Sequence, residues 1–93
     1  MLRWIRSLLF GDRAHMERLA DEMANRVRAI PPEQLASYAL TPWVESVERG
    51  GLPYRVEIRV EPIPGIGRPG VAIRVRRARF PRITLTSYIP VNL

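Results

Sequence analysis

Apolar residues in the first third of the chain recur with the period of a helix. Between Met16 and Ile30 they are spaced by three and four positions, so on a helix they would form one continuous stripe. The stripe consists of Met16, Leu19, Ala20, Met23, Val27 and Ile30. This pattern predicts a helix over residues 13–29. Pro31-Pro32 should end it, because proline cannot continue the helical hydrogen bonds.

A shorter apolar arc precedes this helix and comprises Leu2, Trp4, Ile5, Leu8 and Leu9. We expect Gly11 to end this first segment and Asp12 to cap the next helix. Residues 1–11 should therefore form an amphipathic N-terminal segment that packs on the domain's own sheet or on a second copy. We do not expect residues 1–10 to contact a membrane, because so short a segment has only marginal affinity for a lipid surface.

Two more helical elements are expected before the glycine pair Gly50-Gly51. A short helix should span Glu33–Tyr38. Thr41-Pro42 resembles a helix N-cap followed by proline at the first helical position, which predicts a third helix as far as Arg49. Gly50-Gly51 would then end that helix in the left-handed conformation of a C-cap. Residues 12–50 are therefore expected to form a helical half.

After Gly51 the period of the pattern changes to two, which is typical of strands with one buried face. The alternating runs are Tyr54 to Glu61 and Val71 to Arg76. The segment between them is rich in proline and glycine, so an antiparallel hairpin is expected. A third strand should span Ile83–Ile89, with Pro90 marking an edge strand or a strand end. Residues 52–93 would thus form a β half.

The alternation in the second of these strands breaks at Arg76-Arg77. Continuing it unchanged would bury Arg77 and Arg79, which is unfavourable by several kcal/mol for each unpaired buried charge. We therefore predict a β-bulge or an early strand end at this point, so that both side chains face solvent.

Together these patterns predict a single α+β domain over residues 1–93. N-terminal helices should cover one face of a three-stranded antiparallel meander, in the order α-α-α-β-β-β. The expected core residues are Leu19, Met23, Val27, Leu35, Trp43, Val47, Val56, Ile58, Val60, Ile73, Val75 and Leu85.

The formal net charge of +6 lies entirely in the β half. Every basic residue is arginine. The residues beyond position 49 include eight arginines but only two carboxylates, Glu57 and Glu61. The candidate partner- or anion-binding residues on the solvent face of the sheet are Arg55, Arg59, Arg74, Arg76, Arg77 and Arg79. Glu57 should lie opposite Arg74 or Arg76. Ile66 and Arg68 form a candidate contact tip on the hairpin loop.

The arginine face has three interpretations. It is a solvated surface that Glu57 and Glu61 partly neutralise, or a site for nucleic-acid phosphates, or a docking face for an acidic protein. Only Tyr88 offers a stacking aromatic side chain on that face, which disfavours sequence-specific RNA binding. We expect docking of an acidic protein surface or self-association, with weak, sequence-independent nucleic-acid binding as the alternative.

Residues typical of catalytic and metal sites are scarce. The chain has no cysteine and a single histidine, His15, which lies off the apolar stripe and is expected to be solvated. The loop over residues 62–70 lacks the Gly-Lys-Ser/Thr ending of a phosphate-binding loop and leads into a strand. We expect no enzymatic activity, no cofactor and no metal. The longest apolar stretch is shorter than the about 18–20 residues of a membrane span, so we expect a cytoplasmic protein.

Overall fold

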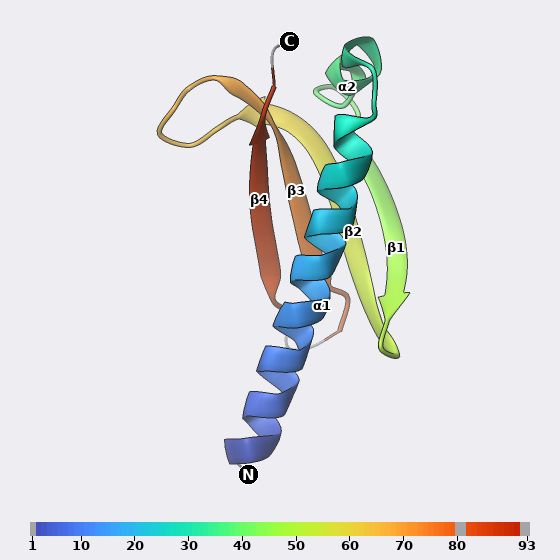
Figure 1. Cartoon of the computed structure of the whole chain (residues 1–93), viewed down its shortest axis with the longest axis vertical. Coiled ribbons are helices and arrows are strands. Elements are labelled where there is room, and N and C mark those ends of the chain that lie inside the picture. The colour runs from blue at the N-terminus through green and yellow to red at the C-terminus, as the bar shows by residue number, and fades with distance from the viewer. Residues whose placement is uncertain (1, 80–81, 92–93) are drawn as a thin grey trace.

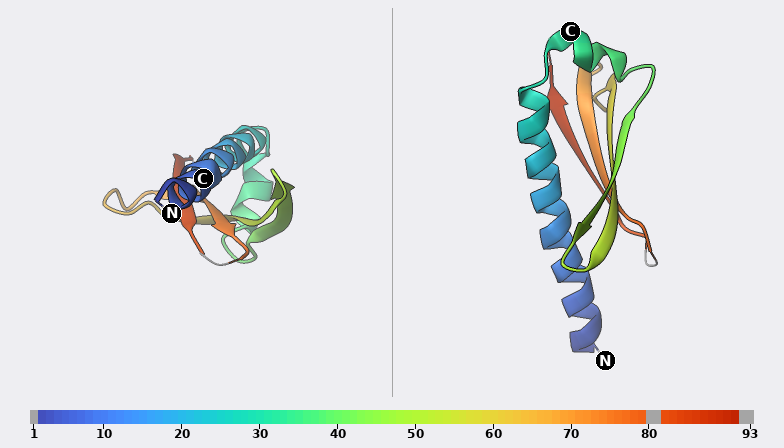
Figure 2. Two further views of the ribbon diagram at one scale, coloured as in Figure 1. Left: turned by 90° about the horizontal axis from the view of Figure 1, so that it is seen from below. Right: turned by 90° about the vertical axis from the view of Figure 1, so that its right-hand side faces the viewer.

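Two helices and four strands make up the part of the chain that the structure, a computed structural model, describes. It covers residues 2–79 and 82–91, with side chains described from Arg13 onward. The elements are α1 (Leu2–Arg28), α2 (Pro32–Ser37), β1 (Trp43–Arg49), β2 (Leu52–Pro62), β3 (Pro69–Arg77) and β4 (Thr84–Pro90). The strands form one antiparallel sheet in the order β1-β2-β3-β4 (Figure 1). Helix α1 runs along one face of this sheet, and α2 lies across one end (Figure 2).

Helix α1 is continuous from Leu2 to Arg28, so the predicted break at Gly11 and the predicted helix start at Asp12 are wrong. A glycine in a helix interior costs about 0.5–1 kcal/mol relative to alanine, and helix-forming segments on both sides can absorb this cost. The first turns of α1 extend past the end of the sheet (Figure 1). The predicted packing of the apolar arc in residues 1–11 lies outside the described side chains.

The third predicted helix is also wrong, because residues 43–49 form the edge strand β1. Gly50 and Gly51 do adopt left-handed conformations, with φ values of 59° and 75°. They close a two-residue hairpin in which Arg49 pairs with Leu52, instead of capping a helix. The α+β class is confirmed, but the order is α-α-β-β-β-β and the meander has four strands.

The hairpin of β2 and β3 and the following edge strand are confirmed. Val56 pairs with Val75 and Ile58 with Ile73, so the apolar positions of both strands share the face beneath α1. β4 ends at Pro90 and is the outer strand of the sheet, as the proline predicted. The loop between β2 and β3 is held closed by the Ile63 N–H, which donates to the Arg68 carbonyl at 2.8 Å.

The core lies between the apolar stripe of α1 and the inner face of β2 and β3. Its buried members are Met16, Leu19, Ala20, Met23, Val27, Leu35, Tyr54, Val56, Ile58, Val71, Ile73 and Val75. Each large apolar side chain contributes about 1.5–3 kcal/mol when fully buried. Four expected core residues, Trp43, Val47, Val60 and Leu85, are only partly buried and pack against this cluster. Three of them lie on the edge strands β1 and β4, where fewer neighbours cover them.

The Arg77 side chain lies on a different side of the sheet from the one predicted for the end of β3. The strand stays in register to its last residue, with Arg76 opposite Arg55 and Arg77 opposite Tyr54. The predicted bulge is therefore wrong, whereas the alternative of an early strand end is confirmed, because β3 ends at Arg77. Arg77 does not face solvent as predicted: it points to the helix side with only 6% of its surface exposed. Backbone hydrogen bonds on both sides hold this register: the Arg77 N–H donates to the Ile83 carbonyl, and the Ala78 N–H to the Pro53 carbonyl, both at 3.0 Å.

Candidate functional site

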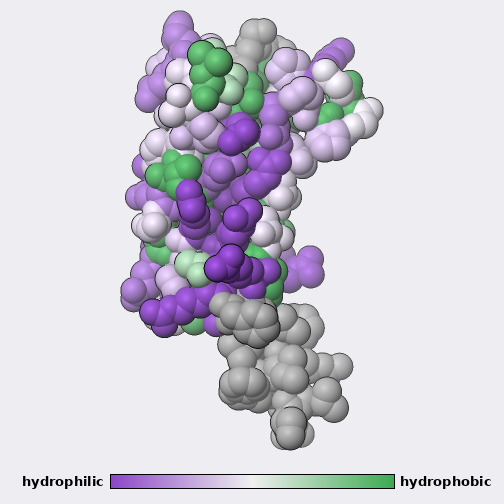
Figure 3. All heavy atoms as spheres, turned by 180° about the vertical axis from the view of Figure 1, so that it is seen from behind, coloured by the Kyte–Doolittle hydropathy of each residue, from purple (hydrophilic) through white to green (hydrophobic). Residues whose placement is uncertain are grey.

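The sheet face turned away from α1 is strongly polar (Figure 3). Hydrophilic side chains cover its centre, as expected where strands alternate between a buried and a solvated side. We call this surface the open face. Its cross-strand pairs in β2 and β3 include Arg55 with Arg76, Glu57 with Arg74, and Arg59 with Ala72.

One half of the open face is a neutral ion-pair network. Arg74 donates a hydrogen bond to Glu61 and lies 3.6 Å from Glu57, while Arg59 lies 3.5 Å from the same Glu57 oxygen. The hydrogen bond to Glu61 raises the pKa of Arg74 above its ordinary value, because it favours the charged guanidinium. Arg59 and Arg74, both predicted as binding residues, are therefore neutralised within the protein.

The other half of the open face carries uncompensated positive charge. Arg55 and Arg76 are exposed and face each other directly across β2 and β3. No described carboxylate forms an ion pair with either of them, and Glu48, on the same face of β1, also has no ion pair among the described residues. Like charges directly opposite each other destabilise a strand pair. The register decides this arrangement: Glu57 pairs with Arg74 and leaves Arg76 facing Arg55.

Two further exposed arginines, Arg79 and Arg82, lie in the adjoining turn between β3 and β4. We call Arg55 and Arg76 on the open face, together with Arg79 and Arg82 beside it in the chain segment between β3 and β4, the arginine end. The prediction placed Arg77 and Arg79 on the sheet face, whereas Arg77 is buried on the opposite side and Arg79 lies in the turn. Arg82 was missed as a site residue, although it belongs to the same run of arginines in the sequence.

The predicted loop tip does not join the arginine end. Ile66 is 62% exposed and Arg68 is exposed, as expected for a hairpin loop. However, this loop follows the pair Pro62–Pro69, at the opposite end of the hairpin from the pair of Arg55 and Arg76. Any contact made by the loop would be separate from one made by the arginine end.

His15 was predicted to be solvated, but the structure places it against neighbouring residues. It is partly buried, its ring lies 6.5 Å from that of Tyr54, and it packs closely against Gly50. Within the described residues, no group of three or more histidine, aspartate or glutamate side chains is arranged to hold a metal ion. The helices that the structure describes include none with the length and apolar composition of a membrane span.

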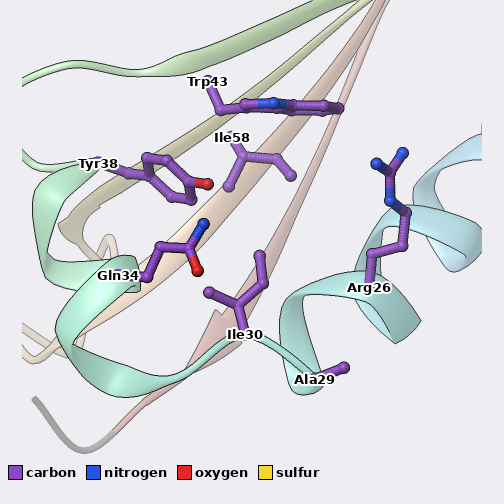
Figure 4. Close-up of a pocket in the computed structure, with 7 residues that line it drawn as sticks. All are labelled: Arg26, Ala29, Ile30, Gln34, Tyr38, Trp43 and Ile58. Carbon is purple, nitrogen blue, oxygen red and sulfur yellow. The ribbon is translucent and has the colours of Figure 1, made fainter.

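A cleft of about 350 Å³ lies between α1, α2 and β1 (Figure 4). It is lined by Arg26, Ala29, Ile30, Gln34, Tyr38, Trp43 and Ile58. The Tyr38 hydroxyl and the Gln34 amide point into it. The guanidinium of Arg26 lies 5.1 Å from the centre of the Trp43 ring and 3.3 Å from Glu45. Its charge is thus already balanced, and the cleft offers an anionic ligand no free cation.

Among the side chains that the structure describes, Arg26 forms one of two ion pairs between α1 and β1. The second is that of Arg49, which lies 2.9 Å from Glu22. Glu22 and Arg26 are four residues apart on α1, a spacing that favours a pair within a helix, but each forms its ion pair with a residue of β1. These links explain how the edge strand β1 is held beside the helix.

No family model, curated protein or solved structure matches this chain. Its function is therefore inferred from the surfaces described above.

Proposed function

We propose that this protein is a non-enzymatic interaction module that docks an acidic protein surface through the arginine end. The observation that carries the proposal is the directly opposed pair of Arg55 and Arg76. The next pair on the same face of β2 and β3 is Glu57 with Arg74, so these two strands can hold a pair of opposite charges. A carboxylate from another molecule would offset the repulsion between these two guanidinium groups of Arg55 and Arg76.

Several features favour a protein partner over nucleic acid. Single-stranded nucleic acids bind to basic surfaces that also offer aromatic platforms. Tyr88 pairs with Ala72 in the half of the open face that holds the neutral network, away from the arginine end. Glu48 and Glu57 lie on the same face and would repel a continuous phosphate backbone. Discrete carboxylates on a protein can instead pair with individual guanidinium groups.

Self-association through this surface is less favourable. A second copy would present the same four arginines, so the two arginine ends would repel each other. An acidic partner removes this repulsion and uses the bidentate geometry in which guanidinium groups bind carboxylates.

Fluorescence anisotropy with a labelled octapeptide of alternating threonine and glutamate tests the proposal. The test variant is Arg55→Ala/Arg76→Ala, and the control is Arg18→Ala/Arg28→Ala, which removes the same charge from exposed positions on α1. Two exposed ion pairs worth about 0.7 kcal/mol each predict an affinity about tenfold weaker for the test variant. The control should change affinity by less than about threefold at an ionic strength of about 0.15 M.

Equal losses in the two variants would show that only net charge matters and would contradict the proposal. Duplex and single-stranded oligonucleotides titrated under the same conditions provide the comparison with nucleic acid. Tighter binding of either oligonucleotide than of the peptide, with a steep loss of affinity as salt rises, would favour the nucleic-acid alternative.

A further inference from the structure

The two edges of the sheet differ in how they are protected. β1 carries Glu45, Glu48 and Arg49 among its seven residues, and Glu45 points inward to Arg26. β4 has no charged residue between Thr84 and Pro90. Natural edge strands usually carry charges, prolines or bulges that prevent pairing with another chain. Apart from its terminal proline, β4 lacks these features and leaves its outer edge open for pairing.

The direction of the free backbone groups on β4 follows from one hydrogen bond. The Arg77 N–H donates to the Ile83 carbonyl at 3.0 Å, so Ile83 faces β3. In an antiparallel ladder the backbone groups of successive residues point to alternate sides. The N–H and carbonyl groups that point away from the sheet are therefore those of Thr84, Thr86 and Tyr88. Pro90 follows Tyr88 by two residues and therefore also points away from β3. Proline suits this position because it has no N–H, and none is needed there to pair with β3.

Positive charge lies over the beginning of this edge. The Arg76 side chain extends from β3 toward β4, where its Nε lies 3.4 Å from the Thr84 hydroxyl. Arg82 is exposed two residues before Thr84. A strand placed beside β4 would thus have its backbone partners on β4 and two guanidinium groups near one end.

We propose that an extended acidic segment of the partner adds to the sheet as a fifth strand beside β4. Outward backbone groups at Thr84, Thr86 and Tyr88 would pair with the segment, and a carboxylate opposite Thr84 would meet Arg76. In such complexes main-chain hydrogen bonds supply affinity and side-chain contacts supply specificity. A second copy fits less well, because its β4 carries no carboxylate for these arginines. This inference rests on the proposed function, since it assigns the acidic partner a backbone conformation.

The test compares Thr86→Pro with Thr86→Ala, using the same labelled peptide. Proline at this position removes an outward N–H and leaves the hydrogen bonds to β3 in place, whereas alanine removes only the side chain. We expect Thr86→Pro to weaken peptide binding at least about tenfold and Thr86→Ala less than about threefold. Circular dichroism and thermal melting establish that both variants are folded.

A second measurement does not depend on the folding of a variant. The wild-type chain is titrated with a peptide of the same sequence that is N-methylated at alternate residues, which keeps its charge but blocks strand pairing. Binding at least about tenfold weaker than that of the unmodified peptide supports the proposal. Unchanged affinity for the methylated peptide overturns it.

The outcomes separate this inference from the proposed function. If Arg55→Ala/Arg76→Ala weakens binding but Thr86→Pro and N-methylation do not, the strand pairing is wrong and the docking of an acidic partner stands. If the arginine variant binds as tightly as the wild type, the proposed function fails. A dimer in light scattering that Thr86→Pro dissociates would assign the edge to a second copy and would also overturn the inference.

Discussion

The hairpin between β1 and β2 allows two neighbouring glycines to be compared directly. Gly50 and Gly51 both have positive φ, at 59° and 75°. A Cβ atom at Gly50 would lie 2.7 Å from the Nε2 atom of His15, whereas a Cβ at Gly51 would meet nothing within 4 Å. Gly51→Ala therefore introduces only conformational strain, while Gly50→Ala adds a steric clash with the imidazole.

The expected magnitudes follow from these two effects. A left-handed conformation costs an L-residue about 1–2 kcal/mol, which sets the loss for Gly51→Ala. Overpacking a filled site typically costs about 1–3 kcal/mol more. The His15 ring, which is partly buried beside Tyr54, has limited room to move away. We therefore expect Gly50→Ala to lower the free energy of unfolding by about 1–3 kcal/mol more than Gly51→Ala.

Urea unfolding followed by circular dichroism measures both variants, and His15→Ala completes a double-mutant cycle. Removing the imidazole should reduce the loss at Gly50 to the value found at Gly51, because only the conformational strain then remains. Equal losses for the two glycine variants, or a coupling energy of zero between Gly50→Ala and His15→Ala, would refute this account of the hairpin.

Two further predictions concern stability. Glu61→Gln removes the charge-assisted hydrogen bond to the partly buried Arg74 and should cost about 1–2 kcal/mol. The matched change Glu17→Gln, in an exposed helix pair, should stay within about 0.5 kcal/mol, and equal losses in urea unfolding would contradict the difference. Gly70→Ala would place a Cβ 2.5 Å from the Cγ1 atom of Ile63 and should cost about 1–3 kcal/mol. That loss should shrink in an Ile63→Ala background, and an unchanged loss would argue against the contact.

Much of the fold could be predicted where periodicity and burial agree. The stripe from Met16 to Val27 predicted the buried side of α1, and the alternation around Val56 and Ile73 predicted the central hairpin. β1 could not be predicted in the same way, because its inward positions include Glu45 as well as partly buried apolar residues. An ion pair to the helix stabilises that carboxylate, and this partner is visible only once the strand is placed.

The candidate site was predictable as a basic surface but not in its details. Arg55, Arg59, Arg74 and Arg76 follow directly from strand alternation. Which of them stay unpaired depends on the hairpin register, and the sequence left two choices for the partner of Glu57. The burial of Arg77 depends on the backbone hydrogen bonds that residues 77 and 78 donate to Ile83 and Pro53. Pro53 and Ile83 lie far apart in the sequence, so strand alternation alone does not reveal these bonds.

The most direct test of the arginine end is an NMR titration that follows the Nε–H signals of individual arginine side chains. The alternating threonine–glutamate octapeptide is added at an ionic strength of about 0.15 M, where charges are screened beyond about 8 Å. The signals of Arg55 and Arg76 should shift with one common binding constant, while those of Arg18 and Arg28 on α1 stay in place. Shifts of similar size at all four arginines would show non-specific attraction to a basic protein and would contradict the assignment of this surface as the docking site.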